Sequence, residues 1–214
     1  VLLRFLRVMK FNVTKAAARY VAHWDAREEW GYGPAPLTYS ALPDDVKKAT
    51  SLGFLQVPFG VRDKTGRQIV LAYPGRMDWS IIEDDNSVKH LMWYVMDVAL
   101  RDEETQKKGV LIINNMAGAS RDSMNRNAIQ GVLHSLQNLI PVRLGGIRLF
   151  NQPWFFSWIF PVVSMFMKAK LRERIRVLGT DYAALGEWCE PPSIPEQLGG
   201  QLAWDHEAWI KIAP

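Results

Sequence analysis

The feature that most restricts the fold is an unbroken apolar run within residues 109–114. Residues 109–114 read Gly-Val-Leu-Ile-Ile-Asn. A strand with one face in water alternates apolar and polar residues, whereas this run is apolar at each position from 110 to 113. It therefore predicts a strand that is buried on both faces, as in a parallel sheet covered by other elements.

Strands and helices are expected to alternate around this run. A turn at 63–66 and a strand at 68–73 predict a hairpin within residues 60–74, and residues 146–151 and 174–178 predict two further strands. Apolar side chains at helical spacing predict helices over 86–104 and around 129–139, with inward-facing Val88, Leu91, Met92, Val95, Met96 and Ala99, then Ile129, Val132, Leu133, Leu136 and Leu139. This order predicts the α/β class with a largely parallel sheet.

The first 48 residues predict a small helical unit. Residues 1–10 give an amphipathic helix with Leu2, Leu3 and Leu6 on one face, and Asn12 is the expected N-cap of a second helix. The second helix repeats apolar residues at Ala16, Ala17, Tyr20, Val21 and Trp24 before a proline-rich connector at 34–43. Because Val1 leads directly into a helical pattern, we expect the first residues of this unit to be missing. The expected division is 1–48, a main domain at 49–202 and an extension at 203–214.

Composition narrows the class of protein. The chain is 48% hydrophobic and 22% charged, which is typical of a globular core. A net charge of +4 is too small to indicate nucleic-acid binding, but it is compatible with an anionic surface. Cys189 is the only cysteine, so no internal disulfide forms, and no signal peptide opens the chain. A cytoplasmic protein is expected.

No motif indicates catalysis, a metal or a cofactor. The sequence has no glycine-rich phosphate loop and no Gly-x-Ser-x-Gly elbow, and its four histidines lack metal-like spacing. His134 is expected to be partly buried and hydrogen-bonded. Cys189 is expected to be structural, with a pKa raised by the neighbouring Glu190. The acidic residues 83–85 are expected to form a solvated helix start.

An apolar segment lies directly beside a basic one. Residues 154–167 carry no charge, and Lys or Arg then occupies alternate positions from 168 to 176. A transmembrane helix needs about 20 apolar residues, and this shorter segment also contains Pro161. We therefore exclude a membrane span. Two interpretations remain: a core helix with a solvated end, or a helix that contacts a membrane surface.

Six segments in order resemble the CRAL-TRIO family of lipid-binding and lipid-transfer proteins. Residues 2–16 resemble the family's helical signature, residues 63–75 its hairpin, and residues 109–120 its buried strand and turn. Residues 141–156 resemble its P-x-R and N-x-P segment, and residues 168–185 and 193–200 resemble its two closing segments. The resemblance implies a sheet that floors a hydrophobic pocket, a helix that gates the pocket, and a small N-terminal helical subdomain. The stretch around residues 170–175 is similar to the branch of the tocopherol and retinaldehyde carriers.

The resemblance also implies a ligand, a membrane partner and site residues. The ligand is a hydrophobic small molecule or a phospholipid, and the pocket and gate residues are Trp154, Phe155, Phe156, Trp158, Ile159, Phe160, Val163, Phe166, Met167 and Ile112. The partner is an anionic membrane, with phosphoinositides bound by Arg7, Arg143, Lys170, Arg172 and Arg174. A monomer associated peripherally with membranes is expected, with no catalytic residues.

Four positions depart from the family pattern. Asn115 replaces an aspartate at a turn, and Ile194 replaces a leucine. Val142 and Leu171 stand where phosphatidylinositol-binding members have a glutamate and a threonine. These last two departures predict that phosphatidylinositol is not the preferred ligand.

Two other functions are compatible with the sequence. The same fold serves as a regulatory adaptor that recruits a larger protein to membranes, which a further domain beyond residue 214 would favour. A hydrolase assembled from residues distant in sequence is the third interpretation. We expect the lipid carrier first, the adaptor second and the hydrolase last.

Overall fold

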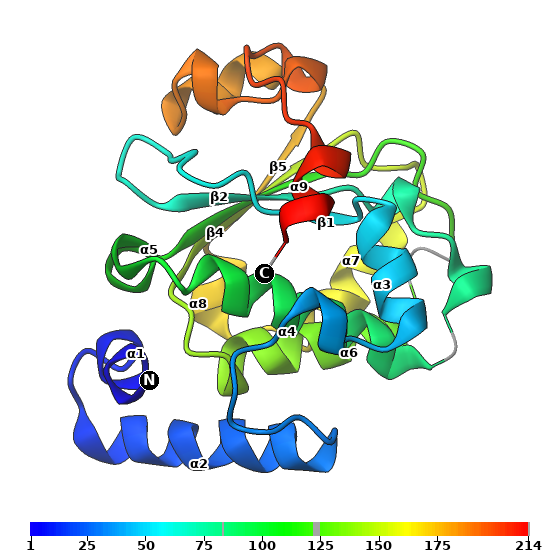
Figure 1. Ribbon diagram of the computed structural model, residues 1–214. Helices are drawn as coiled ribbons and strands as arrows, with labels where there is room; N and C mark the ends of the chain where they lie inside the picture. Colours follow the sequence, from blue (N-terminus) through cyan, green and yellow to red (C-terminus); the bar gives the residue numbers. More distant parts are fainter. Residues whose placement is uncertain (83, 122–124, 214) are drawn as a thin grey trace.

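A five-stranded sheet forms the centre of the computed structural model, which describes residues 1–82, 84–121 and 125–213 (Figure 1). The strands lie in chain order: β1 (Leu55–Gln56), β2 (Gln68–Ala72), β3 (Val110–Asn115), β4 (Leu144–Phe150) and β5 (Ile175–Gly179). β1 is antiparallel to β2, and the other pairs are parallel. The predicted α/β class with a largely parallel sheet is confirmed. β1 was not predicted, because two residues are too few for a sequence pattern.

The apolar run at 109–114 forms the central strand β3. Its even and odd residues enter two separate cores: Val110 and Ile112 face one side of the sheet, and Leu111 and Ile113 face the other. All four side chains are buried. The predicted hairpin before it is reduced to a single bridge between Arg62 and Gln68, although the turn after Asp63 forms as expected.

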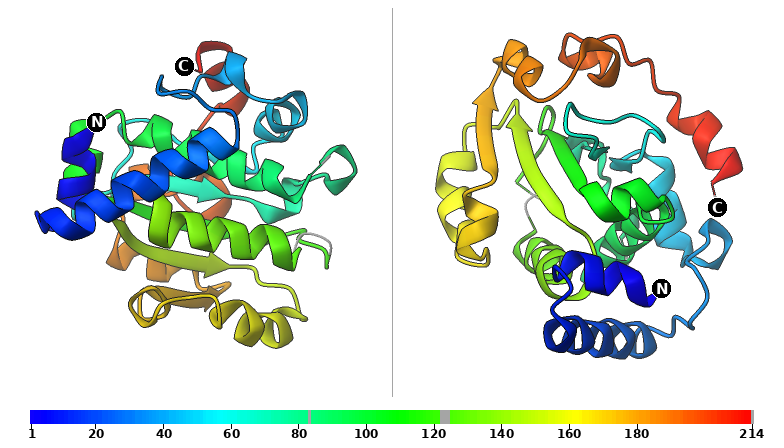
Figure 2. Two further views of the ribbon diagram at one scale, coloured as in Figure 1. Left: turned by 90° about the horizontal axis from the view of Figure 1, so that it is seen from below. Right: turned by 90° about the vertical axis from the view of Figure 1, so that its left-hand side faces the viewer.

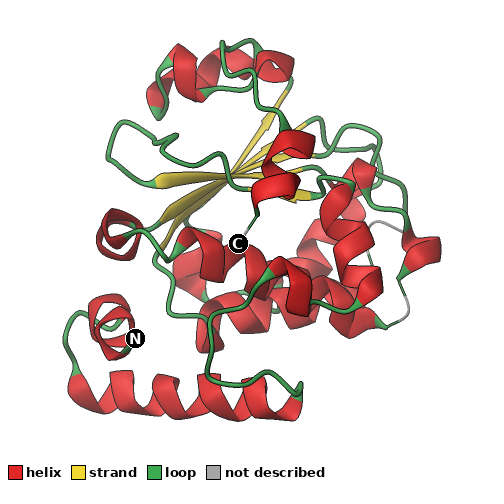
Figure 3. Cartoon of the chain, in the orientation of Figure 1, coloured by secondary structure: helices red, strands yellow, loops and turns green. Residues whose placement is uncertain are grey.

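Helices cover one face of the sheet (Figures 1 and 3). They are α3 (Asp44–Ser51), α4 (Asp85–Ala99), α6 (Arg126–His134), which continues as a π-helix over Ser135–Leu139, and α7 (Phe156–Ser164). All six inward-facing residues predicted for α4 are buried. The predicted continuation to residue 104 is wrong, because α4 ends at Ala99 and Asp102 caps a separate helix, α5 (Glu103–Lys108).

Short 3-10 turns cover the opposite face, at Tyr182–Glu187, Pro191–Ser193 and Glu196–Leu198. They appear as the orange segment at the top of Figure 1. Cys189 is fully buried there, as expected for a structural residue. Burial raises the pKa of its thiol to about 12, and the nearby Asp63 carboxylate adds to this, rather than the predicted Glu190.

The N-terminal helices α1 (Leu2–Val8) and α2 (Val13–Glu29) form as predicted, and the Asn12 side chain caps α2 by accepting from the Lys15 amide. Their buried faces were predicted only in part. Phe5 is only 2% exposed, whereas Leu2 and Leu3 lie largely in solvent. In α2 the predicted Ala17 and Val21 are exposed, and the buried residues are Ala16, Arg19, His23, Ala26 and Arg27.

Buried polar groups explain that error in α2. Arg19 donates to the Leu136 carbonyl oxygen at 3.0 Å, and the His23 ring stacks on Trp93 with ring centroids 4.7 Å apart. A polar side chain tolerates burial when it has such partners. A prediction from the spacing of apolar residues does not identify a buried polar residue of this kind. His134 shows the opposite error, because it is exposed rather than partly buried.

The C-terminal helix α9 (His206–Ile212) lies against α3. His206 Nε2 is 2.8 Å from the Thr50 carbonyl oxygen, and the indole of Trp209 is buried. Of the predicted acidic helix start, Asp84 is exposed and caps α4 by accepting from the Asn86 amide, Glu83 lies outside the described residues, and the Asp85 side chain is not described. The division at residues 48 and 202 stays a prediction.

Candidate functional site

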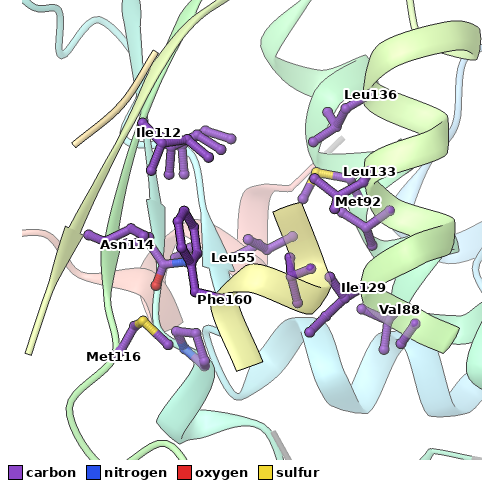
Figure 4. A pocket seen from close by; sticks show the side chains of 18 of the residues that line it. Leu55, Val88, Met92, Ile112, Asn114, Met116, Ile129, Leu133, Leu136 and Phe160 are labelled. Atoms are coloured by element: carbon purple, nitrogen blue, oxygen red, sulfur yellow. The ribbon is translucent and has the colours of Figure 1, made fainter. Parts of the chain in front are cut away.

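A cavity of about 190 Å³ lies between the helical layer and the sheet (Figure 4). Its walls come from all five strands and from α4, α6 and α7. The lining is almost wholly apolar, and from the sheet and helices it includes Ile112, Ile147, Leu149, Val88, Met92, Ile129, Val132, Leu133 and Leu136. Among the lining residues that the structure describes, only Asn114 and Trp79 carry a polar side-chain group. The cavity therefore suits an apolar molecule.

One face of α7 forms the outer wall of this cavity. Phe156, Ile159, Phe160 and Val163 line it, and Met167 lines it just beyond the helix. These five residues and Ile112 were predicted for the pocket, and the structure brings them together. Each of the four residues on the helix remains only half-buried. These residues therefore separate the cavity from solvent while remaining partly accessible to solvent themselves.

The other face of α7 is apolar and exposed. Trp154 and Trp158 are 68% and 72% exposed, and Val162 and Met165 continue the same side of the segment. Exposed apolar residues this large and this close together are typical of an interaction surface. The predicted set of gate residues thus divides between two environments, and Pro161 lies inside the helix that separates them.

Two predicted residues belong to neither face. Phe155 is buried beside the ring of Trp154, with ring centroids 5.7 Å apart. Phe166 is half-buried against the main core, and the Arg126 guanidinium lies over its ring, 5.4 Å from the centroid. Neither lines the cavity.

A second cavity, of about 480 Å³, has a basic lining. It lies where α1 and α2 meet the start of β4 and α8 (Ala169–Arg172). Eight cationic residues line it: Lys10, Arg19, Arg67, Lys108, Arg143, Lys168, Lys170 and Arg174. No acidic residue is among the described residues that line it. An anion is the complementary ligand for such a site.

The cations of this basic cavity differ in how they are held. Arg143 donates to the carbonyl oxygens of Arg7 and Lys107, and Arg174 donates to that of Leu144. Burial lowers the pKa of Arg19 to about 10, so this guanidinium stays charged at neutral pH. Within the described part of the chain, the ammonium groups of Lys10, Lys108 and Lys170 make no hydrogen bond or ion pair. These three lysines are free to meet a ligand.

Three of the five predicted basic residues come together in this cavity: Arg143, Lys170 and Arg174. Arg172 is exposed but lies outside it. Arg7 is also outside, because its guanidinium binds Glu103 at 2.5 Å and Gln106 at 2.6 Å. The sequence pattern missed five contributors, Lys10, Arg19, Arg67, Lys108 and Lys168, of which only Lys168 belonged to a recognisable basic cluster.

The two positions that disfavour phosphatidylinositol lie in the same place. Val142 and Leu171 are both buried, and both line the basic cavity. Each presents an apolar group where phosphatidylinositol-binding members, by the resemblance above, have a polar one. The preference against phosphatidylinositol stays a prediction.

The described residues contain no group of three or more His, Cys, Asp or Glu side chains placed to hold a metal ion. No helix within 1–82, 84–121 and 125–213 has the length and apolar character needed to cross a membrane.

Comparison with known proteins agrees with this architecture. The family model of the CRAL/TRIO domain matches residues 54–200. Clavesin-1 of Xenopus laevis is 27% identical over 219 residues, and human clavesin-2 is 29% identical over 220 residues. Each match covers 98% of this chain, which spans 63% and 64% of the length of those two relatives. The crystal structure of Sfh5 is similar with a TM-score of 0.68 at 15% identity, over 97% of this chain and 73% of Sfh5.

Proposed function

Because the chain belongs to the CRAL/TRIO domain family of lipid-binding and lipid-transfer proteins, we propose that it carries a lipid or another hydrophobic small molecule in the cavity beneath α7 and exchanges it with membranes. The observation that carries this proposal is the division of α7 into two apolar faces. Phe156 and Phe160 line the cavity, and Trp154 and Trp158 lie in solvent. Such a helix can exchange cavity contacts for bilayer contacts without exposing the cavity to water.

The size of the cavity requires α7 to move. A cavity of about 150 Å³ holds benzene, so the 190 Å³ here accommodates a ring-sized group. A long acyl chain or a fused-ring lipid needs more room. The helix α7 is half-buried and contains Pro161, which removes one helix hydrogen bond. Moving α7 outward therefore breaks fewer buried contacts than moving another wall of the cavity. In this proposal α7 acts as the gate.

Membrane docking uses the exposed face of α7 together with the basic cavity. Figure 2 supports this, since α7 (yellow) and α8 (gold) lie on the same side of the molecule in both views. Inserting two or three large apolar side chains contributes about 3–6 kcal/mol at most, and each basic residue near an anionic leaflet adds about 1 kcal/mol. Binding of this strength is useful but reversible. The anionic partner we propose is a phosphoinositide headgroup, held by Lys170 and the other lysines of the basic cavity.

The finer parts of the proposal come from the resemblance and the charge pattern. We propose a monomer that associates peripherally with cytoplasmic membrane surfaces and has no catalytic role and no nucleic-acid partner. Membership of the branch of tocopherol and retinaldehyde carriers stays a prediction, as does a ligand other than phosphatidylinositol.

Lipid extraction of the purified protein, combined with a transfer assay, tests the proposal. Native mass spectrometry should show a stoichiometric hydrophobic adduct that organic extraction removes. The same lipid, made fluorescent, should move between donor and acceptor vesicles faster when the protein is added. An adduct-free protein that leaves the transfer rate of a broad lipid panel unchanged contradicts the proposal.

A further inference from the structure

The apolar cavity contains one polar oxygen that the fold leaves without a partner. Oδ1 of Asn114 is buried and accepts no hydrogen bond from any described residue. Asn114 belongs to β3, and its side chain lines the cavity (Figure 4). A buried carbonyl oxygen without a donor destabilises a folded chain, so native proteins seldom keep one without a reason.

The strand register surrounds this oxygen with apolar side chains. Asn114 pairs with Ala72 on β2 and with Leu149 on β4, and both of these residues line the same cavity. Ile112 and Met116 precede and follow it on the cavity wall. An apolar residue at position 114 would complete this wall, so neither the sheet nor its packing requires an amide there.

The neighbouring Asn115, in contrast, has a side chain whose hydrogen bonds the fold satisfies. Asn115 is on the opposite face of β3, and its Oδ1 accepts from Asn151 Nδ2 at 2.8 Å and from the Ala117 amide at 3.1 Å. The described residues therefore supply two donors to one asparagine and none to the side-chain oxygen of its neighbour. The donor for Asn114 has to come from the contents of the cavity.

We infer that Asn114 determines ligand specificity by accepting a hydrogen bond from a hydroxyl group of an uncharged lipid. This inference rests on the proposed function and names the class of its ligand. A neutral alcohol or phenol supplies the missing O–H donor while the rest of the molecule fills the apolar cavity. An ether or a hydrocarbon leaves Oδ1 unpaired, and a carboxylate brings a second acceptor and a buried charge. Such a site selects strongly, because its polar group stays unpaired with the wrong ligand.

Ring-sized probes test this without any movement of α7, because they match the volume of the cavity. Phenol, anisole and toluene share one ring and differ in carrying a donor, an acceptor only, or neither. Their dissociation constants are measured by calorimetric titration on the parent and on Asn114→Leu, whose side chain has the same number and branching of heavy atoms. We expect phenol to bind about two- to tenfold more weakly to the variant, as expected for one lost hydrogen bond. Anisole and toluene should change by less than about twofold, since neither donates.

Two variants keep this test decisive. Asn114→Val, whose branched side chain suits a strand, replaces Asn114→Leu if the latter melts early. Trp79→Phe removes the other polar group of the cavity, the indole Nε1, which also lacks a partner among the described residues. If Trp79→Phe weakens phenol and the Asn114 variants do not, Trp79 recognises the ligand and the inference is wrong.

The remaining outcomes separate the inference from the proposed function. If the parent binds toluene and the Asn114 variants weaken phenol no more than anisole, the inference fails and the proposed function stands. Equal weakening of phenol and anisole means that Asn114 presents Nδ2 as a donor, which also overturns the inference. If none of the three probes binds the parent, the cavity is no ligand site, and the proposed function falls with it.

Discussion

The rings of Phe156 and Phe160 stack with centroids 5.0 Å apart and planes inclined by 28°, and both line the cavity beneath α7. One helical turn separates them, so they share a face. Trp154 and Trp158 repeat that spacing on the exposed face, with their ring centroids 5.7 Å apart. If the two faces have different tasks, substitutions on each should impair transfer for different reasons.

The inner face is tested by Phe160→Asp. We expect the protein to stay folded, because the side chain is half-buried, with a loss of about 1–3 kcal/mol in the free energy of unfolding. A carboxylate in the cavity should lower ligand occupancy, while binding to vesicles stays near the parental value. Circular dichroism, lipid extraction and vesicle sedimentation measure the three properties. Complete unfolding would instead indicate that α7 is an ordinary core helix.

The outer face is tested by Trp158→Asp, on the same helix and with the same new side chain. Here the unfolding free energy should change by less than about 0.5 kcal/mol, because the indole is 72% exposed. Vesicle binding should weaken by about tenfold, and ligand occupancy should not change. Ile212→Asp is the control, since Ile212 is 79% exposed on α9, on the opposite side of the molecule (Figure 2). Equal vesicle binding by all three proteins would rule out α7 as the docking face.

The free lysines of the basic cavity should control binding to anionic vesicles. Lys10→Ala combined with Lys170→Ala should weaken this binding by about tenfold or more, and higher salt should weaken it further in the parent than in the variant. The thermal melt should be nearly unchanged, because neither ammonium group has a partner among the described residues. Flotation with phosphoinositide-containing vesicles measures the effect.

A charge-matched control separates this site from net charge. Lys48→Ala combined with Lys211→Ala removes the same two charges from α3 and α9, outside the basic cavity. Its vesicle binding should stay within about twofold of the parent, because charges far from the contact are screened over about 8–10 Å. If both double variants lose binding equally, the attraction comes from overall charge rather than from the cavity.

The sequence predicted β2 to β5 from their short apolar runs, and α4 and α6 from a clear helical period, whereas β1 and α3 were not predicted. Val88, Leu91 and Val95 of α4 all face the core as expected. The sequence could not show which residues of α7 face the cavity and which face solvent. The helix is apolar on every side, so the spacing of its apolar residues does not distinguish the two faces. The sequence pattern also joined α4 and the start of α5 into one helix, because the helical pattern continues up to the cap at Asp102.

The basic cavity was only partly predictable for a different reason. Lys10, Arg19 and Lys108 lie far in sequence from the basic cluster at 168–176, and they meet it only in the folded chain. Arg7 carried the right charge but forms an ion pair with Glu103, which no local pattern reveals. Asn114 was overlooked because a single amide at the end of an apolar run has no pattern of its own.

Asn115 should contribute to stability, and Asn114 should not. Asn115→Ala removes the acceptor of two hydrogen bonds and leaves the half-buried Asn151 amide without one of its partners, so the free energy of unfolding should fall by about 1–3 kcal/mol. Asn114→Ala removes an oxygen that accepts nothing, so the ligand-free protein should lose less than about 1 kcal/mol. Urea denaturation of ligand-free samples measures both. A larger loss for Asn114→Ala would give that amide a structural role.

His23 should make the protein less stable in mild acid. Burial, aided by the positive charges of Arg27, Arg19 and Arg4, lowers its pKa from 6.5 to about 4, although a hydrogen bond to the Leu139 backbone opposes this. Between about pH 6.5 and 4 the unfolded chain therefore binds a proton that the folded chain does not. The contribution of His23 is fully present above pH 6.5, and up to about 3 kcal/mol is lost as the pH falls towards 4.

His23→Phe should remove this part of the pH dependence. The variant keeps an aromatic ring against Trp93, so its stability at pH 7.5 should fall only by the loss of the backbone hydrogen bond, about 1 kcal/mol. Between pH 7.5 and 4.5 it should lose less stability than the parent, and the remainder comes from His90 and His206, whose pKa values burial also lowers. Urea denaturation at both pH values gives the difference, and staying above pH 4.5 limits the titration of carboxylates. Parallel loss in parent and variant would show that His23 is protonated without cost in the folded chain.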